Sequence, residues 1–465
     1  MDNPIPHLVV TPELFALPYK DHIILYAPLK GIALLINKTA AHWLVRYQTN
    51  PMSLTSTSIY QQLVDAKILE KPGTTVIPPL PSRVPFEPTD VILLTTTECN
   101  LRCVYCYASA GTRKISFRPE VARAAIRLAI DNAIAQEKTV SHLSFHGGGE
   151  PTMALPFIKE CVDYANKRAN GHVEVLTSIV TNGYINSHQA KWIADNVQSI
   201  QVSLDGPAFI HNEQRPLWNG RGSFERVCAT IKYLEQARVP DLLVKATVAE
   251  QHVRDMPEIV RFFCETFNVR RFHLGPVLNN GRSLTTGYCQ PNVDEFIQYT
   301  QQAQEVARSY DREVVVSLAQ TTFPKLRVAF CGLTDPNFAV SVEGQVTGCY
   351  EVIYADDPRA RIFHFGHYVR EHDTFVFNEE RMAALQDRLM PNLDRCKNCF
   401  ARWHCGGDCH IRLVDETTGV ESYPVFDFRC QVNRALVRNE LIKAIEHRGK
   451  VVHFEPTMSY ERGFR

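Results

Sequence analysis

The central part of the chain, residues 90–310, alternates between two hydrophobic patterns. Short apolar runs rich in β-branched residues predict buried strands, and segments whose apolar positions recur every three or four residues predict amphipathic helices. The predicted strands are 90–97, 142–146, 173–181, 200–204, 242–248 and 270–277, and helices include 119–136, 157–169, 224–237 and 257–267. Six strand–helix units in succession predict an α/β fold with a parallel sheet, either a partial or complete barrel or an open doubly wound sheet.

The two ends of the chain have different patterns. Residues 21–37 predict a β-hairpin, 38–48 and 58–72 predict helices, and the proline-rich stretch 78–88 predicts a linker. Residues 431–447 predict a closing helix. We therefore expect three units, at 1–85, 86–315 and 316–465.

Residues suited to ligand binding follow the predicted strands. ECNLRCVYC follows the first strand, HGGGEPT the second, TNGY the third, and SLDGP ends the fourth. In a parallel sheet these loops meet at one edge. Taken alone, TNG and LDGP are ordinary turn sequences. HGGGEPT is more specific, because its glycines allow close backbone approach to a ligand and place Glu150 beside it.

Fourteen cysteines are unusual for such a chain, and they cluster. Cys99, Cys103 and Cys106 have the spacing C-x3-C-x2-C, and five more lie between Cys396 and Cys430. In a reducing compartment such cysteines are metal ligands more often than disulfides. Three thiolates from one loop suit a [4Fe–4S] cluster with one iron open to another ligand. Structural zinc, with a nearby histidine as fourth ligand, is the alternative.

Composition excludes several classes of protein. Lysine plus arginine equals aspartate plus glutamate at 50 each, which gives no general indication of nucleic-acid binding. The N-terminus lacks the basic and apolar regions of a signal peptide, and no apolar run approaches the roughly 18 residues of a membrane helix. We therefore expect a cytoplasmic protein without nucleic-acid or membrane partners.

The cysteine loop, GGEP at 148–151 and the order of the α/β units resemble the radical S-adenosylmethionine (SAM) enzymes. The resemblance implies a partial (β/α)6, TIM-like barrel in which the three loop cysteines hold a [4Fe–4S] cluster. The open iron would chelate SAM, whose reductive cleavage yields a 5′-deoxyadenosyl radical. The matching positions imply further cofactor contacts, with Tyr105 near the adenine, Gly148 and Gly149 at the methionine amino group, Glu150 beside them, and Ser203 and Arg215 at the ribose and the carboxylate.

The C-terminal cysteines resemble a SPASM domain, which houses two auxiliary [4Fe–4S] clusters. The chain reads C-x12-G-x4-C from Cys331 to Cys349, then C-x2-C-x5-C-x3-C from Cys396 to Cys409, then Cys430. The resemblance implies a first auxiliary cluster on Cys331, Cys349 and Cys409, and a second on Cys396, Cys399, Cys405 and Cys430. A zinc ribbon over residues 396–409 is the alternative.

The hairpin and helices of residues 1–85 resemble, in layout, the winged-helix peptide-recognition element of the PqqD type. Such elements capture a leader peptide by strand addition to an exposed sheet edge. A cap that only shields the barrel is the alternative. A DNA-binding winged helix is disfavoured, because basic residues are not clustered there.

Together these resemblances imply a maturase that crosslinks a ribosomally made precursor peptide, through a thioether or a carbon–carbon bond, with flavodoxin or ferredoxin as electron donor. The enzyme alternative is an anaerobic sulfatase-maturating enzyme, which makes formylglycine. That family has a catalytic aspartate directly after the cysteine that matches Cys349, where this chain has Tyr350, so Glu351 is the candidate catalytic residue. A zinc-binding structural scaffold is the non-enzyme alternative.

Overall fold

The centre of the molecule is an open sheet. The computed structural model describes residues 8–51, 57–77, 80, 85–316, 318, 323, 325–332, 337–422 and 427–458. Its main sheet has 11 strands in the order β12-β11-β10-β9-β8-β7-β6-β14-β15-β16-β17. The strands from β6 to β12 run parallel. They are β6 (Val91–Leu94), β7 (Val140–His146), β8 (Glu174–Thr181), β9 (Ser199–Ser203), β10 (Asp241–Val248), β11 (Arg271–Pro276) and β12 (Glu313–Val316).

All six strands expected from the sequence are present, and a seventh strand, β12, follows them. The EVVV sequence of β12 is short but β-branched, and it pairs with β11. Strand β6 has β14 as its second neighbour, so β6 and β12 do not pair and the barrel stays partial.

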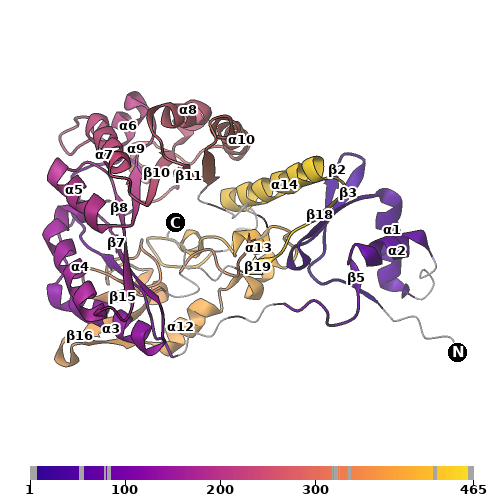
Figure 1. The fold of residues 1–465 in the computed structure, drawn as a ribbon, viewed down its shortest axis with the longest axis horizontal. Helices are drawn as coiled ribbons and strands as arrows, with labels where there is room; N and C mark the ends of the chain where they lie inside the picture. Colours follow the sequence, from indigo (N-terminus) through magenta and orange to yellow (C-terminus); the bar gives the residue numbers. More distant parts are fainter. Residues whose placement is uncertain are drawn as a thin grey trace.

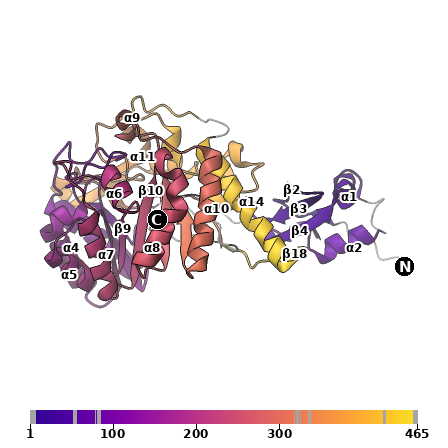
Figure 2. The same ribbon diagram turned by 90° about the horizontal axis from the view of Figure 1, so that it is seen from above.

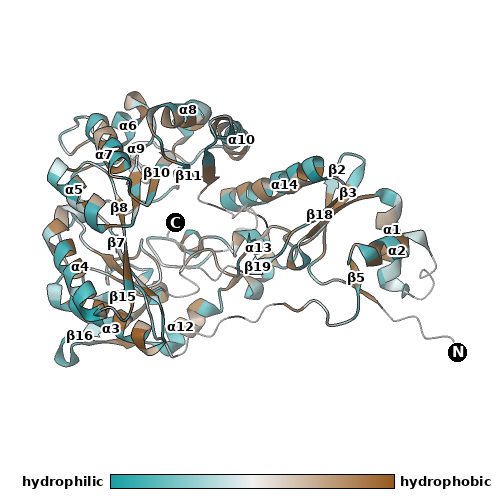
Figure 3. Cartoon of the chain, viewed as in Figure 1, coloured by the Kyte–Doolittle hydropathy of each residue, from teal (hydrophilic) through white to brown (hydrophobic). Residues whose placement is uncertain are grey.

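Helices cover the outer face of the parallel strands (Figures 1 and 2). Strand residues that face them, such as Val244 and Phe272, are fully buried in the main hydrophobic core. Figure 3 shows the hydrophobic strands beneath helices whose outer faces are hydrophilic. These helices are α3 (Pro119–Ala135), α4 (Leu155–Ala169), α5 (Ser187–Asn196), α6 (Ala208–Gln214), α7 (Phe224–Gln236), α8 (Met256–Thr266), α9 (Ser283–Thr286) and α10 (Val293–Ser309).

The C-terminal third continues the sheet of the barrel. Strand β14 (Ala339–Val340) pairs parallel with β6, and β15 (Gln345–Thr347), β16 (His364–Val369) and β17 (Thr374–Phe377) extend it as an antiparallel meander. The sheet therefore crosses the unit boundary expected near residue 316. The remaining elements are β13 (Lys325–Leu326), α11 (Ala360–Phe363), α12 (Glu379–Gln386), α13 (Arg402–Cys405), α14 (Phe428–Arg448), β18 (Val451–His453) and β19 (Thr457–Met458).

A second sheet lies at the N-terminal end, in the order β18-β4-β3-β2. The expected hairpin is present as β3 (His22–Ala27) and β4 (Ile32–Asn37), and β2 (Phe15–Tyr19) adds a strand that the sequence did not indicate. Helix α1 (Lys38–Thr49) follows, with its first turn capped by the Asn37 side chain, and α2 (Ser58–Asp65) is shorter than expected. A small ladder joins β1 (Val9–Val10) to β5 (Leu69–Glu70). Most of the predicted linker 78–88 lies outside the described residues.

The two sheets are joined by the C-terminal segment (Figure 1). Helix α14 packs Val437 and Leu441 against Ile24 and Tyr26 of β3. Strand β18 then pairs antiparallel with β4. Within the described residues, no helix combines the length and hydropathy that a membrane crossing needs.

Strand β18 depends on a glycine opposite it, which gives a first prediction. Gly31 has φ +63°, and a Cβ at this position would overlap the carbonyl oxygen of Phe454. Gly73 has a similar φ of +78°, but nothing lies within 4 Å of its Cβ position. A left-handed non-glycine residue costs about 1–2 kcal/mol, and overpacking adds about 1–3 kcal/mol. Gly31→Ala should therefore lower the free energy of unfolding by at least about 1 kcal/mol more than Gly73→Ala, measured by chemical denaturation. Equal losses would show that β18 does not hold this position.

Candidate functional site

The three cysteines of the first loop share one site at the end of β6. The loop turns at Cys106, whose N–H donates to the Cys103 carbonyl (3.3 Å), and its sulfur accepts from the Ala110 N–H (3.5 Å). The pKa of Cys103 is raised to about 12, mainly by burial and also by the charges of Cys106 and Cys99, against the opposing effect of Arg215. Burial, and then the charge of Glu150, raises the pKa of Cys99 to about 11. The three thiols are therefore close enough to interact electrostatically.

This donor set fits a metal cluster. A thiol with such a raised pKa stays protonated at neutral pH unless a cation replaces the proton, because the thiolate is the metal-binding form. Tetrahedral zinc holds its sulfurs about 3.8 Å apart, given Zn–S bonds of about 2.3 Å. Among the described residues, the one ligand group within 4.8 Å is Asp408, Asp427 and Cys430, and no three cysteines are that compact. The wider spacing of the loop cysteines suits a polynuclear cluster better than a single zinc ion.

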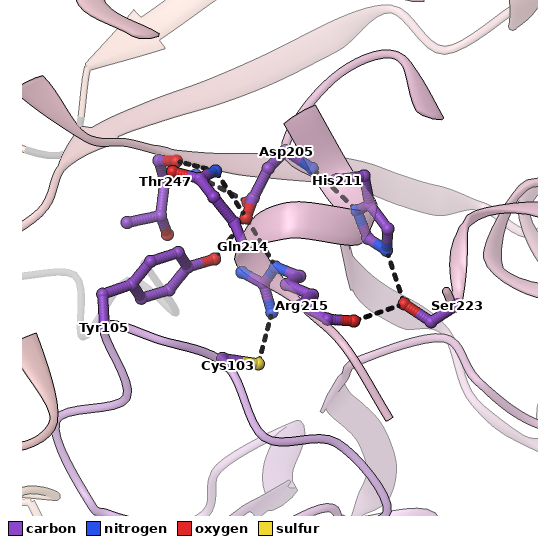
Figure 4. Close-up of polar contacts among 8 residues, drawn as sticks. All are labelled: Cys103, Tyr105, Asp205, His211, Gln214, Arg215, Ser223 and Thr247. Atoms are coloured by element: carbon purple, nitrogen blue, oxygen red, sulfur yellow. Dashed lines mark hydrogen bonds and ion pairs between the residues drawn. The ribbon is translucent and has the colours of Figure 1, made fainter. Parts of the chain in front are cut away.

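Beside the loop, a buried carboxylate organises the residues that follow β9 (Figure 4). The Asp205 side chain is fully buried. Its Oδ1 accepts from the Thr247 N–H (2.9 Å), and its Oδ2 accepts from Arg215 Nε (2.9 Å) and Gln214 Nε2 (3.0 Å). The Tyr105 hydroxyl donates to the same Oδ2. Asp205 thereby ties the ends of β9 and β10 to the cysteine loop.

A second chain of hydrogen bonds fixes the backbone around Arg215. The N–H of Asp205 donates to His211 Nδ1 (3.2 Å), so His211 carries its proton on Nε2 and donates to Ser223 Oγ (3.0 Å). Ser223 in turn donates to the Arg215 carbonyl (2.7 Å). Burial lowers the pKa of His211 to about 4, which keeps the ring neutral and this direction of donation intact.

Arg215 faces both Asp205 and the cysteines. Its Nη1 lies 3.9 Å from the Cys103 sulfur, and its guanidinium lies 5.3 Å from the centre of the Tyr105 ring. The Nε is used by Asp205, so the Nη atoms are the part of the fork directed toward the loop.

The sequence indicated Arg215 and Tyr105 but treated Asp205 as a turn former. The spacing of His211, Gln214 and Arg215 along α6 was the signal that could have revealed a shared helix face.

The GGGEP stretch braces the cysteine loop. Gly149 donates to the Thr96 carbonyl (2.9 Å), and a Cβ at Gly149 would overlap the carbonyl oxygen of Glu98. A Cβ at Gly148 would overlap the Ile353 side chain. Gly149 is therefore required by the close approach of the backbone at Glu98, whereas the contact at Gly148 is the flexible end of a side chain.

Glu150 joins neighbouring turns by hydrogen bonds in this structure. Its carboxylate accepts from the Thr152 N–H (3.0 Å) and hydroxyl (2.7 Å), from the Thr181 hydroxyl (2.7 Å) and from the Asn182 N–H (2.7 Å). A carboxylate has about four acceptor positions, so this one has none to spare for a cofactor. Asn182 then reaches the Cys99 sulfur through its Nδ2 (3.7 Å). The TNG turn, which looked ordinary in the sequence, therefore links Glu150 to the cysteine loop through Asn182.

Ser203 and Glu351 lie on different parts of the structure. Ser203 ends β9 and makes no side-chain hydrogen bond to a described residue. Glu351 forms an ion pair with Arg412 and accepts from Asn280 Nδ2 (3.1 Å). Burial, and then the Glu351 charge, raises the pKa of Cys349. Glu351 is thus next to a predicted cluster ligand and is held by a cation.

The C-terminal cysteines fall into two electrostatic groups. Charges on Cys409 and Cys331 act on Cys349, after burial and Glu351. Charges on Cys430 and Cys396 act on Cys405, after burial and Asp408, and Cys399 acts on Cys396. These groups have the same members as the two expected ligand sets. Cys289, which belongs to neither set, is exposed, and its thiol donates to the Gly287 carbonyl (3.7 Å).

The buried Asp205–Arg215 pair yields a second prediction. Removing one partner of a buried ion pair costs about 3–5 kcal/mol, whereas an exposed pair contributes about 1 kcal/mol or less. Asp205→Asn should therefore destabilise the protein strongly, and the control Asp356→Asn, which breaks the exposed pair with Arg113, should do so weakly. Chemical denaturation of the protein measures both. Similar losses in the two variants would contradict the organising role of Asp205.

Comparison with known proteins identifies the family of this region. Residues 93–263 match the family model of the Radical SAM superfamily. A cysteine-type anaerobic sulfatase-maturating enzyme of Clostridium novyi is 28% identical over 171 residues, which are 36% of this chain and 46% of that enzyme. The mycofactocin maturase MftC of Mycolicibacterium smegmatis is 32% identical over 165 residues, covering 35% of this chain and 38% of MftC. The chain thus matches less than half the length of these relatives.

Solved structures share the fold over a larger part of the chain. The structure of anSMEcpe with bound AdoMet (SAM) has a TM-score of 0.60 at 18% identity, and the match covers 77% of this chain and 96% of that one. Streptococcus suis SuiB bound to its precursor peptide SuiA has a TM-score of 0.50 at 12% identity, covering 90% and 99%. The chain therefore contains a radical SAM domain, with a central parallel sheet, and belongs among the relatives of sulfatase and peptide maturases.

Proposed function

We propose that this protein is a radical SAM maturase that modifies a ribosomally made precursor peptide. The observation that carries the proposal is the convergence of three loop thiols with Arg215 at one edge of an open α/β barrel. Cys99, Cys103 and Cys106 would hold a [4Fe–4S] cluster. When bound there, the cluster and SAM supply a 5′-deoxyadenosyl radical that abstracts hydrogen from a substrate.

The surrounding residues position this site. Asp205 holds the Arg215 fork toward the cysteines, and its bonds to Tyr105 and Thr247 fix the loops on either side. The Nη atoms of Arg215 suit a ligand carboxylate, because a planar guanidinium binds carboxylates through two parallel hydrogen bonds. Glu150 acts on this site indirectly, through Asn182.

The two C-terminal cysteine groups support two auxiliary [4Fe–4S] clusters. Cys331, Cys349 and Cys409 would hold the first, and Cys396, Cys399, Cys405 and Cys430 the second. The C-terminal third pairs with the barrel sheet through β14 and β6. The auxiliary clusters and the cluster of the first cysteine loop would therefore lie in parts of the chain that share one sheet. Auxiliary clusters would accept the electron that remains on the substrate after hydrogen abstraction. A flavodoxin or ferredoxin would be the external electron donor of the enzyme.

The edges of the N-terminal sheet bear on how a precursor peptide would bind. Strand β18 of the same chain occupies the outer edge of β4. At the other edge, Pro18 of β2 has no N–H to donate, and its carbonyl accepts from Arg438 Nη2 (3.0 Å). Strand addition, the mode expected from the resemblance to PqqD-type elements, is therefore blocked at β4 and interrupted at Pro18 of β2.

A groove beside β2 is the better candidate for the peptide. Its volume is about 620 Å³, and its walls are residues 13–18 on one side and Lys397, Asn398, Phe400, Arg434 and Arg438 on the other. Its lining has three cations, of which Lys397 also pairs with Asp394 (2.6 Å), and one carboxylate, Glu13, which pairs with Arg402. The excess of positive charge favours an acidic segment. We propose that the leader of the precursor binds here through side chains. SuiB, which shares the fold, has been solved with its precursor peptide.

A second candidate function is formylglycine formation, which is favoured by the similarity to the Clostridium novyi enzyme. Glu351 is the residue on which this candidate depends. Its carboxylate is held by Arg412 and Asn280, so it would need to leave that pair to act as a base. Incubating the holoenzyme with a cysteine-containing sulfatase peptide, and looking for the formylglycine aldehyde by mass spectrometry, separates the two candidates.

The cluster assignment gives a third prediction. Replacing Cys99, Cys103 and Cys106 together by alanine should abolish reductive cleavage of SAM and remove roughly four of roughly twelve iron atoms, because the other cysteines keep their clusters. Iron analysis and chromatography of 5′-deoxyadenosine measure this. The control Cys228→Ala changes a half-buried thiol on α7 and should behave as the wild type. SAM cleavage at the wild-type rate in the triple variant would refute the assignment, and a protein that binds only zinc would support the scaffold alternative.

The groove gives a fourth prediction. Lys397→Glu with Arg438→Glu should weaken binding of the precursor at least about tenfold, because two attractions become repulsions. Fluorescence anisotropy with candidate peptides from neighbouring reading frames measures the affinity. The matched control is Lys191→Glu with Arg254→Glu, an equal charge change at exposed residues of the barrel. Uncoupled SAM cleavage should persist in both variants, and equal peptide affinity in both would remove the groove from the proposal.

A further inference from the structure

A row of polar side chains crosses three neighbouring strands of the barrel. The register pairs Lys245 of β10 with Ser203 of β9 on one side and with His273 of β11 on the other. Paired residues on adjacent strands point to the same face of a sheet. Lys245 therefore lies in the middle of a row that begins at Ser203, next to the predicted SAM site.

The row lies on the concave face of the barrel. Val244 and Ala246, on either side of Lys245 in β10, are fully buried in the core beneath the outer helices. Because side chains alternate along a strand, Lys245 points the opposite way, into the interior of the open barrel. This is the side on which Arg215 and Arg429 act electrostatically on Lys245.

Lys245 is the unmatched charge of this interior. Arg215 pairs with Asp205 (2.9 Å), and Arg429 pairs with Asp408 (2.7 Å). No hydrogen bond or ion pair joins Lys245 to any residue that the structure describes. Burial lowers the pKa of Lys245, and the charges of Arg215 and Arg429 lower it further. Lys245 is therefore the one of these three cations that has no carboxylate partner among the described residues.

Lys245 is only partly accessible to solvent, and an ammonium group that loses part of its hydration without gaining a partner destabilises the ligand-free protein. The arrangement is favourable only when an anion enters the barrel. A lysine also suits this task, because its single charge on a flexible stem can meet a carboxylate from several directions.

We propose that Lys245 binds a carboxylate that a ligand carries into the barrel. This inference rests on the proposed function, and it adds a binding residue for the substrate or cofactor of the same site. Two carboxylates can reach a position one strand from Ser203. One belongs to the methionine moiety of SAM, and the other to an aspartate or glutamate side chain of the peptide.

The test compares three forms of the reconstituted holoenzyme, the wild type, Lys245→Met and Lys245→Arg. The methionine variant keeps the volume and removes the charge, and the arginine variant keeps the charge. Lys191→Met is the matched control, because Lys191 is an exposed lysine on α5. Calorimetry gives the affinity of each form for SAM and for decarboxylated SAM, and then, with SAM saturating, for N-acetyl-aspartate amide and N-acetyl-asparagine amide.

The outcomes distinguish the two sources. If Lys245 holds the carboxylate of SAM, Lys245→Met weakens SAM about tenfold or more and leaves decarboxylated SAM unchanged. If it holds a peptide carboxylate, SAM affinity stays the same, and the wild type prefers the aspartate probe over the asparagine probe in a way that Lys245→Met loses. Lys245→Arg should retain most of the affinity in either case. Unchanged affinities for all four ligands in Lys245→Met would overturn the proposal.

Thermal unfolding without ligand separates a binding role of Lys245 from a purely structural one. Loss of a lysine that only stabilises the fold would lower the midpoint of unfolding. We expect Lys245→Met to raise the midpoint of unfolding slightly, because it removes an unpaired and partly desolvated charge, and Lys191→Met to leave it unchanged. A lowered midpoint together with unchanged affinities would assign Lys245 to structure alone. SAM cleavage by the wild type is measured separately, so failure of the proposed function can be recognised apart from failure of this inference.

Discussion

Two charges taken out of water, the carboxylate of Asp205 and the guanidinium of Arg215, determine how the loops of this site are placed. The carboxylate is fully buried and accepts hydrogen bonds from the end of β10, from Gln214 and Arg215 at the end of α6, and from the cysteine loop. Either charge alone would be strongly unfavourable there, so each requires the other. The pair in turn requires the neutral His211 and Ser223, which hold the backbone around Arg215 in place.

A second constraint comes from the course of the C-terminal third. It extends the barrel sheet through β14, and its last helix and strand complete the N-terminal sheet through α14 and β18. One segment therefore links the cysteine-rich region to both other parts of the molecule. This linkage limits what the N-terminal sheet can do, because β18 already covers the edge at which a peptide strand could add. A groove between β2 and α14 remains, with cations along one wall.

Charge is distributed unevenly within this molecule. The chain as a whole carries equal numbers of acidic and basic residues. Around the concave face of the barrel, however, Arg215 and Arg429 are matched by carboxylates and Lys245 is not. Net composition therefore hides a cation that has no carboxylate partner, and local charge governs the binding of anions.

The sequence by itself determined the parallel sheet, because strands follow from hydrophobic period, and it predicted the radical SAM cysteines and the grouping of the C-terminal cysteines from short-range spacing. Its expected strands recur as β6 to β11, and its ligand sets recur as electrostatically coupled groups. Only the tertiary structure decided the rest. Asp205 looked like a turn residue, and Glu150 looked free for a cofactor. Their partners, Thr247 and Asn182, lie on other strand ends, and no local pattern specifies such contacts. The tail after residue 450 was uninformative for the same reason, since β18 is a strand only because β4 lies beside it.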